Sequence, residues 1–168
     1  MKKLLILTVI MSLAAGVASA QNYAFVNSQK VYQALPSYTA AVAELDSLAS
    51  SYQKKIDAAY AELEKQYNNY LVVKNNLSAD DQQSSEDKII ANEKKIGEYQ
   101  QSVFGTDGVV AKKQEELLKP FTDNFNEAIK AFAEINSIDL VIDVASSPSI
   151  LFYSPEKDKT EQIIIMLK

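Results

Sequence analysis

Aromatic side chains are the residues best suited to binding chemistry in this sequence, which has nine Tyr and six Phe but no Trp, His or Cys. The absence of His and Cys excludes the usual zinc sites, Cys nucleophiles and Ser-His triads. Carboxylates are plentiful, but none stands in a motif that would form a pocket, so acid–base catalysis is not predicted. A Tyr ring joins a large apolar face to a polar tip and can hold a flexible chain without rigid specificity. The sequence therefore favours non-covalent binding, and we do not expect an enzyme.

These aromatic residues sit on or beside a long apolar stripe. From Tyr38, apolar residues recur at alternating steps of four and three, with one polar exception at Gln66. The stripe comprises Tyr38, Val42, Leu45, Ala49, Tyr52, Ile56, Ala59, Leu63, Gln66, Tyr70, Val73 and Leu77. A seven-residue repeat of this kind indicates a coiled coil, and about forty residues of it make a helix roughly 60 Å long. Such a helix must project from the rest of the domain.

Tyr positions on the stripe differ from those beside it. Tyr52 and Tyr70 lie on the stripe, so we expect them to pack. The side chains placed wider of it, or beside Gly105, are candidate contacts for a bound polypeptide: Tyr60, Tyr67, Tyr99 and Phe104. The alternative is that these four simply broaden the seam of a helical hairpin.

Composition argues against several other partners. Every cation is Lys, and acidic residues outnumber basic ones by 22 to 17. An acidic chain without Arg is a poor candidate for nucleic-acid binding, which depends on a basic patch. The sequence has no glycine-rich phosphate-binding motif, so we expect no nucleotide, metal or other cofactor.

The first twenty residues have the pattern of a secretory signal peptide. Lys2 and Lys3 precede an apolar run, and Ala18-Ser19-Ala20 provides small residues for cleavage after Ala20. The run is too short to span a membrane. Cleavage would leave 15 basic residues against 22 acidic ones and place the protein in the periplasm.

The remaining chain divides into a body and a helical hairpin. Residues 21–36 predict a first strand at Tyr23–Val26 and a short helix capped by Asn27 or Ser28. Residues 37–136 predict the hairpin arm, with Ser37 capping its first helix, a tip at about 77–86, and a return helix that starts near Ser78.

Two features interrupt the return helix. Gly105 and Gly108 are candidate hinges, because each glycine inside a helix costs about 1 kcal/mol relative to Ala. A continuous helix with two tolerated glycines is the alternative. Pro120 should kink the helix or mark a join near the base of the arm.

Residues 137–168 predict the closing part of the body. Ile138–Val144 and Ile150–Tyr153 read as two strands, followed by a final helix capped by Thr160. Three short strands bury too little surface alone, so partner subunits should complete the core. The residues expected to form this shared body are Tyr23, Phe25, Leu140, Ile142, Leu151 and Tyr153.

The two ends of the chain carry a resemblance. Residues 23–32 resemble the opening strand of the Skp/OmpH family and the turn that follows it. They read Tyr-Ala-Phe-Val-Asn and, after Ser28, Gln-Lys-Val-Tyr. Residues 140–143 and 150–155, with Asp158-Lys159-Thr160, are similar to its closing strands and helix. The family consists of ATP-independent periplasmic chaperones that bind unfolded outer-membrane proteins. The resemblance implies a mainly α fold in which a trimer holds three helical arms around a cavity.

The sequence departs from the family pattern at two places, and two other architectures are alternatives to it. The tip is acidic, with Asp80, Asp81, Glu86 and Asp87, so we do not expect binding to lipopolysaccharide or an anionic membrane. An apolar residue of the closing motif is replaced by Lys159. A coiled-coil spacer or adaptor of the cell envelope, binding one folded partner, is the main alternative. A prefoldin-like cage is less consistent, because its strands lie between the helices.

Overall fold

The computed structural model describes residues 22–168, so the predicted signal peptide and its cleavage site lie outside the described residues. The described chain forms two compact units. The arm contains Tyr32–Asn124, and the body contains residues 22–31 and Phe125–Lys168. In chain order the elements are β1 (Tyr23–Val26), α2 (Ser28–Gln33), α3 (Pro36–Val73), η1 (Lys74–Asn76), α4 (Ala79–Phe104), α5 (Val109–Ile135), β2 (Leu140–Asp143), η2 (Pro155–Lys157) and α6 (Thr160–Leu167). The predicted fold class is confirmed: the protein is mainly α, with a long helical hairpin and a small sheet.

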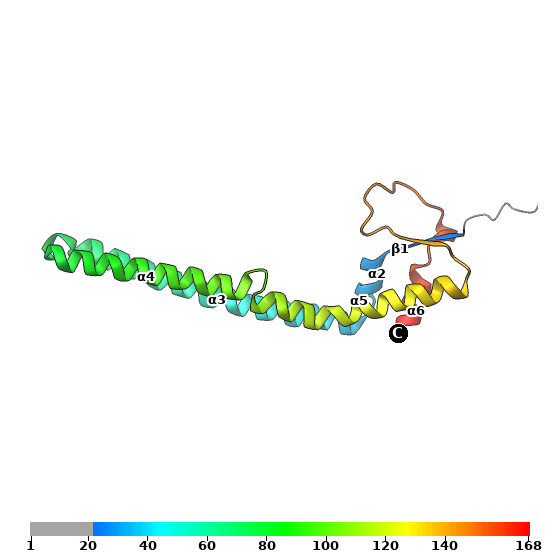
Figure 1. Cartoon of the computed structure of the whole chain (residues 1–168), viewed down its shortest axis with the longest axis horizontal. Coiled ribbons are helices and arrows are strands. Elements are labelled where there is room, and N and C mark those ends of the chain that lie inside the picture. Colours follow the sequence, from blue (N-terminus) through cyan, green and yellow to red (C-terminus); the bar gives the residue numbers. More distant parts are fainter. Residues whose placement is uncertain (1–21) are drawn as a thin grey trace, which may run out of the picture. The chain divides into compact units, whose positions relative to one another are not determined.

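The arm is an antiparallel hairpin in which α4 runs back along α3 (Figure 1). Its tightest packing is at Ile56 and Val103, each 1% exposed. The two polar residues on the seam satisfy each other, because Asn92 Nδ2 donates to Gln66 Oε1 at 3.0 Å. A mismatched register would separate this pair, so it helps to specify the alignment of the helices.

The helix starts follow local chemistry. Ser78 caps α4 as predicted, and its Oγ accepts from the Asp81 N–H at 3.2 Å. The prediction for α3 is wrong, because the helix begins at Pro36 and Ser37 does not cap it. Pro is suited to the first helical position, where its missing N–H is not needed.

The return segment is two helices, so the alternative of one continuous helix is wrong. Residues 105–108 separate α4 from α5. A Cβ at Gly105 would lie 2.4 Å from the Gln101 carbonyl oxygen, and one at Gly108 would lie 2.4 Å from the Val103 carbonyl oxygen. The close backbone approach therefore requires glycine at both positions. Helix α5 continues through Pro120, and the division between arm and body follows at Asn124.

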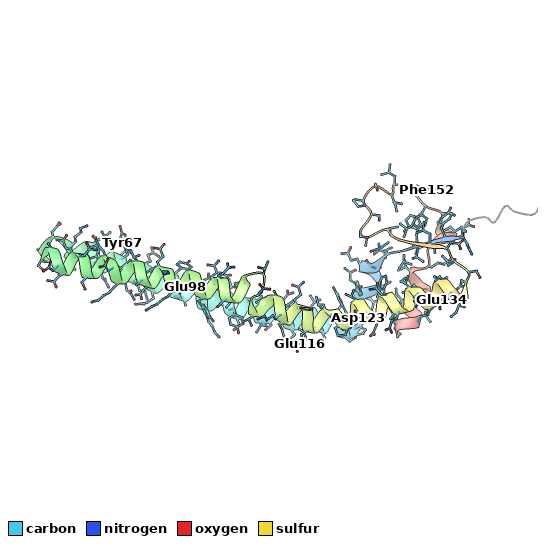
Figure 2. The ribbon with its side chains drawn as sticks, viewed as in Figure 1. Tyr67, Glu98, Glu116, Asp123, Glu134 and Phe152 are labelled. Carbon is cyan, nitrogen blue, oxygen red and sulfur yellow. The ribbon has the colours of Figure 1, made fainter. Side chains whose placement is uncertain are left out.

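The body contains one parallel two-stranded sheet, in which Tyr23 pairs with Leu140 and Val26 with Asp143. The predicted strand at Ile150–Tyr153 is wrong, since this segment forms no ladder within residues 22–168. Its sequence suits a strand, but no sheet edge in this described part of the chain pairs with it. Leu151 and Phe152 are 95% and 85% exposed, and Phe152 is labelled on this segment in Figure 2.

A buried polar cluster ties the two ends of the chain together. Thr160 is the first residue of α6 rather than its cap, which corrects the prediction. Its hydroxyl donates to Asp158 Oδ1 at 2.6 Å and accepts from the Asn27 N–H at 2.9 Å. The Asn27 side chain in turn caps α2 by accepting from the Lys30 N–H at 2.9 Å, which confirms one of the two predicted caps.

A second carboxylate, on β2, holds the start of α2. Asp143 Oδ2 accepts from the Ser28 hydroxyl at 2.7 Å, and Oδ1 accepts from the N–H groups of Ser28 and Ala145. Burial raises the pKa of Asp143, but the hydrogen bonds from Ser28 and Ala145 outweigh this effect and hold the pKa below its ordinary value. Burial likewise raises the pKa of Asp158, and the hydrogen bonds from Thr160 and Tyr153 lower it by more.

These shifts predict acid sensitivity of the body. A carboxyl whose pKa is lower in the folded state than in the unfolded state stabilises the fold above the unfolded pKa. That stability is lost as pH falls through about 4 and then through the folded values. We expect the thermal midpoint of the body to drop between about pH 6 and pH 3, and Asp158→Asn to reduce the drop. Near-ultraviolet circular dichroism of Tyr would report it, and an unchanged midpoint would contradict the prediction.

Candidate functional site

The four aromatic residues predicted to contact a bound polypeptide all reach solvent on the arm. Tyr60 is 40% exposed, Tyr67 49%, Tyr99 39% and Phe104 38%. Exposed apolar side chains mark an interaction surface when they gather on one face, whereas single exposed rings are ordinary, so the grouping of these rings decides their meaning. By contrast, Tyr52 is half-buried and Tyr70 is buried, which is consistent with packing on the seam.

Tyr99 differs from the other three. Its ring centroid lies 6.5 Å from that of Tyr52 on the facing helix. This aromatic contact crosses the seam, so part of the Tyr99 side chain contributes to hairpin packing. For Tyr99, the alternative that it broadens the seam therefore has structural support.

The structure adds two exposed apolar residues that sequence reasoning missed. Leu71 lies one turn after Tyr67 on α3, and Ile90 lies on α4 with 61% of its surface exposed. Ile90 belongs to a row with Phe104, two heptads further on, and Tyr60 and Tyr67 form a similar row on α3. The spacing of seven could have revealed Ile90 in the sequence, and the spacing of four from Tyr67 could have revealed Leu71.

The two rows lie on the same side of the arm. Lys74 continues the row of Tyr60 and Tyr67, and its Nζ lies 3.1 Å from Glu86 Oε1 on α4. Glu86 stands one turn before Ile90, so this ion pair joins the α3 row to the α4 row. We define the aromatic face as Tyr60, Tyr67, Leu71, Ile90 and Phe104.

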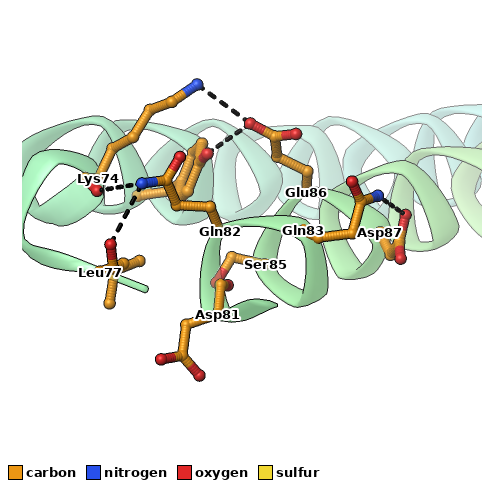
Figure 3. Close-up of polar contacts among 9 residues, drawn as sticks. Lys74, Leu77, Asp81, Gln82, Gln83, Ser85, Glu86 and Asp87 are labelled. Carbon is orange, nitrogen blue, oxygen red and sulfur yellow. Dashed lines mark hydrogen bonds and ion pairs between the residues drawn. The ribbon is translucent and has the colours of Figure 1, made fainter. Parts of the chain in front are cut away.

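The tip of the hairpin is closed by a polar network, shown in Figure 3. Gln82 Nε2 donates to the carbonyl oxygens of Lys74 and Leu77 at 3.1 and 3.2 Å, which satisfies the carbonyl groups at the end of the first helix. Glu86 accepts hydrogen bonds from the Tyr70 hydroxyl and from Lys74, and both lower its pKa. The network keeps the end of the arm closed.

The two candidate hinge residues flank the only break in the return segment within the described arm. The Gly105 N–H donates to Gln101 O at 2.8 Å, and the Gly108 N–H donates to Gly105 O at 2.9 Å. The break follows Phe104 directly, so one member of the aromatic face stands at this boundary.

Most of the residues predicted for a shared body gather around the sheet. Tyr23 contacts Phe25 edge-on at 5.7 Å, and Phe25 packs on Tyr153 at 4.6 Å between ring centroids. Leu140 and Ile142 pair with Tyr23 and Phe25 in the sheet. Phe25 is buried, whereas Tyr23, Leu140 and Leu151 remain exposed within a single chain.

The described residues offer neither a metal site nor a membrane-spanning helix. Within residues 22–168, no three carboxylates cluster closely enough to hold a metal ion. None of the helices in this part of the chain has the length and apolar character to span a membrane.

Comparisons with known proteins agree with the fold described above, a helical hairpin arm and a small body. A search of curated proteins found no match. The fold is similar to the crystal structure of a candidate outer membrane chaperone (OmpH-like) from Caulobacter crescentus CB15, with a TM-score of 0.67 over 89% of this chain and 85% of that chain. The two sequences are 12% identical, so this likeness shows the fold alone. The family model for OmpH-like outer membrane proteins matches residues 22–167, which confirms the resemblance carried by the two ends of the sequence. This chain belongs to the OmpH-like family.

Proposed function

We propose that this protein is an ATP-independent periplasmic holdase chaperone for unfolded outer-membrane β-barrel proteins. The observation that carries the proposal is the aromatic face, which places large apolar side chains on the surface of a long arm. The membership in the OmpH-like family supports a chaperone role in general. The predicted signal peptide supports the periplasmic location.

The physical need for such a protein follows from its clients. A β-barrel chain presents alternating apolar residues and unpaired strand edges in water, and both promote aggregation. Several separate apolar contacts on an arm would cover parts of the client while leaving it mobile. Release then requires no nucleotide, because folding into the membrane removes the client from the equilibrium.

The proposal includes a trimer that encloses a cavity. A two-stranded sheet is marginal by itself, and this body leaves Leu140, Leu151 and Phe152 exposed. The segment Ile150–Tyr153 has strand-forming residues without a strand partner within residues 22–168. Burial of these groups between copies would remove apolar surface from water and complete the core. Gly105 and Gly108 are proposed to let each arm adjust to clients of different size.

The test is suppression of client aggregation. A urea-unfolded outer-membrane β-barrel is diluted into buffer with the chain from Gln21 to Lys168, without nucleotide, and turbidity is followed. We expect suppression near one trimer per client, with the client still able to fold into added lipid vesicles. Sedimentation of the same sample should show the trimer. An unrelated acidic protein at equal mass concentration is the control.

Two outcomes would contradict the proposal, one for the holdase activity and one for the cavity. Turbidity that is unchanged across several β-barrel clients would exclude a holdase. A monomer at micromolar concentration would exclude the enclosing cavity. If turbidity is unchanged, the protein is better described as a spacer or adaptor of the cell envelope, and the next measurement would be a search for one folded partner.

A further inference from the structure

We propose that client binding is confined to one side of the arm, and that this side prefers unfolded segments in which Lys or Arg alternates with aromatic or aliphatic residues. This inference rests on the proposed function and adds the chemical class of the bound segment. It is carried by the positions of apolar and charged side chains around α3 and α4.

The aromatic face is accompanied by rows of carboxylates. Asp57 and Glu64 precede Leu71 at intervals of seven on α3, and Glu86 and Glu93 are seven apart on α4. Residues seven apart on a helix lie on the same side, two turns or about 10 Å apart. The carboxylates therefore alternate with the apolar side chains along one side of the arm.

The charge of this side is not neutralised within the arm. Among the seven-spaced rows of α3 and α4 that make up this side, Lys74 is the one cation, and it pairs with Glu86. Asp57, Glu64 and Glu93 form no ion pair with any residue from 22 to 168. Asp57 accepts a hydrogen bond from Gln53 instead. A bound segment bearing Lys or Arg would supply the opposite charge beside each apolar contact.

The back of the arm has a different composition. Val72 is 81% exposed and follows Lys65 by seven residues on α3, while Lys88 and Lys95 are seven apart on α4. Val72 is the large apolar residue with the greatest exposure in the arm, but it stands alone among charged, small or polar residues, where Lys65 pairs with Glu62. The exposed rings do not extend to this side.

The spacing of the aromatic face favours an extended chain over a folded partner. A stable interface between folded proteins buries about 800 Å² on each side in one packed patch. Here the apolar groups are separated by carboxylates along the helices. Counting from the bonded pair Gln66 and Asn92 places Gly97 within one residue of the level of Tyr60, and a Cβ at Gly97 would meet nothing within 4 Å. This open position leaves room beside the ring for the main chain of an extended segment.

The first experiment compares two synthetic peptides of equal length, one alternating Tyr with Lys and the other alternating Tyr with Glu. Each carries a fluorescent label, and anisotropy is measured with the chain from Gln21 to Lys168. We expect the Lys peptide to bind at least about tenfold more tightly, with the ratio falling as salt screens the charges. Equal binding of the two peptides, or tighter binding of the Glu peptide, would overturn the charge preference.

Variants then locate the binding side. The double variant Glu64→Lys with Glu93→Lys should abolish or reverse the preference for the Lys peptide. Glu98→Lys, on the back of α4, should leave that preference unchanged. Figure 2 labels Tyr67 and Glu98 along the arm. Tyr67→Ser with Ile90→Ser should weaken binding of the Lys peptide about tenfold. Val72→Ser is the matched control and should have no effect. All of these positions are exposed, and circular dichroism would verify the fold of each variant.

The results separate this inference from the proposed function. Loss of binding in Val72→Ser or Glu98→Lys equal to that in the aromatic-face variants would overturn the one-sided site. If the wild-type chain suppresses aggregation but shows no peptide preference, the holdase function stands and this inference fails. If the wild-type chain neither suppresses aggregation nor binds either peptide, the proposed function fails first.

Discussion

Thr160→Val should lower the free energy of unfolding of the body by about 2 kcal/mol, whereas Thr160→Ser should lower it by less than about 1 kcal/mol. Val has nearly the shape of Thr, so the main change is the loss of the hydroxyl. Thr160 is 4% exposed, and its oxygen is the acceptor for the Asn27 N–H. A partly buried N–H without an acceptor costs more than an average hydrogen bond contributes.

The same substitution removes a donor to Asp158. That carboxylate would still accept from the Thr160 N–H at 2.9 Å, but it would lose the 2.6 Å hydrogen bond from the hydroxyl. We therefore expect Thr160→Val to raise the pKa of Asp158 toward its unfolded value and to make the acid-induced loss of stability of the body smaller than in the wild type. Urea unfolding followed by near-ultraviolet circular dichroism would measure both effects. A variant as stable as the wild type would show that this cluster does not hold the ends of the chain together.

The three glycines of the described chain should respond in opposite directions when changed to Ala. Gly108→Ala should destabilise the arm by about 2 kcal/mol, because the new Cβ meets the Val103 and Gly105 carbonyl groups within 3 Å. Gly97→Ala should stabilise it by about 1 kcal/mol, because the Cβ meets nothing within 4 Å inside a regular helix. Gly105→Ala should resemble Gly108→Ala, since its Cβ would lie 2.4 Å from the Gln101 carbonyl oxygen.

Thermal unfolding monitored by far-ultraviolet circular dichroism would compare the three variants. Gly97→Ala serves as the matched control, because it makes the same chemical change in the same arm. If Gly108→Ala were stabilising, the break between α4 and α5 would be an optional feature that a continuous helix can replace. The range of client sizes bound by Gly105→Ala and Gly108→Ala would then test the proposed hinge, because a hinge variant should narrow that range relative to the wild type.

Local features of the fold were predictable from the sequence because their causes lie within a few residues. The seven-residue repeat predicts α3 and most of its seam without reference to any other segment, although the predicted seam residue Val73 is 43% exposed. Ser78 and Asn27 are polar residues directly before a helical segment, and each caps the helix that follows. The resemblance of the two chain ends also sufficed for the family, since those segments recur in fixed order.

The errors arose where a distant segment decides the outcome. Thr160 was expected to cap α6, but its hydroxyl bonds to Asn27, far away in the sequence. Ile150–Tyr153 has strand-forming residues, but a strand also needs a partner edge, and none between residues 22 and 168 pairs with it. Gly105 and Gly108 signalled a weak point, yet only the backbone positions of Gln101 and Val103 show that glycine is required.

The candidate binding site likewise has features that the sequence predicts and features that only the fold decides. The sequence by itself determined which residues are aromatic and, through their spacing of seven, that Tyr60 and Tyr67 share one side of a helix. Only the tertiary structure decided that Ile90 and Phe104 lie on that same side, because this depends on how α4 aligns with α3. The alignment is set by contacts between the helices, including Gln66 with Asn92 and Lys74 with Glu86, and such contacts form only when the hairpin closes.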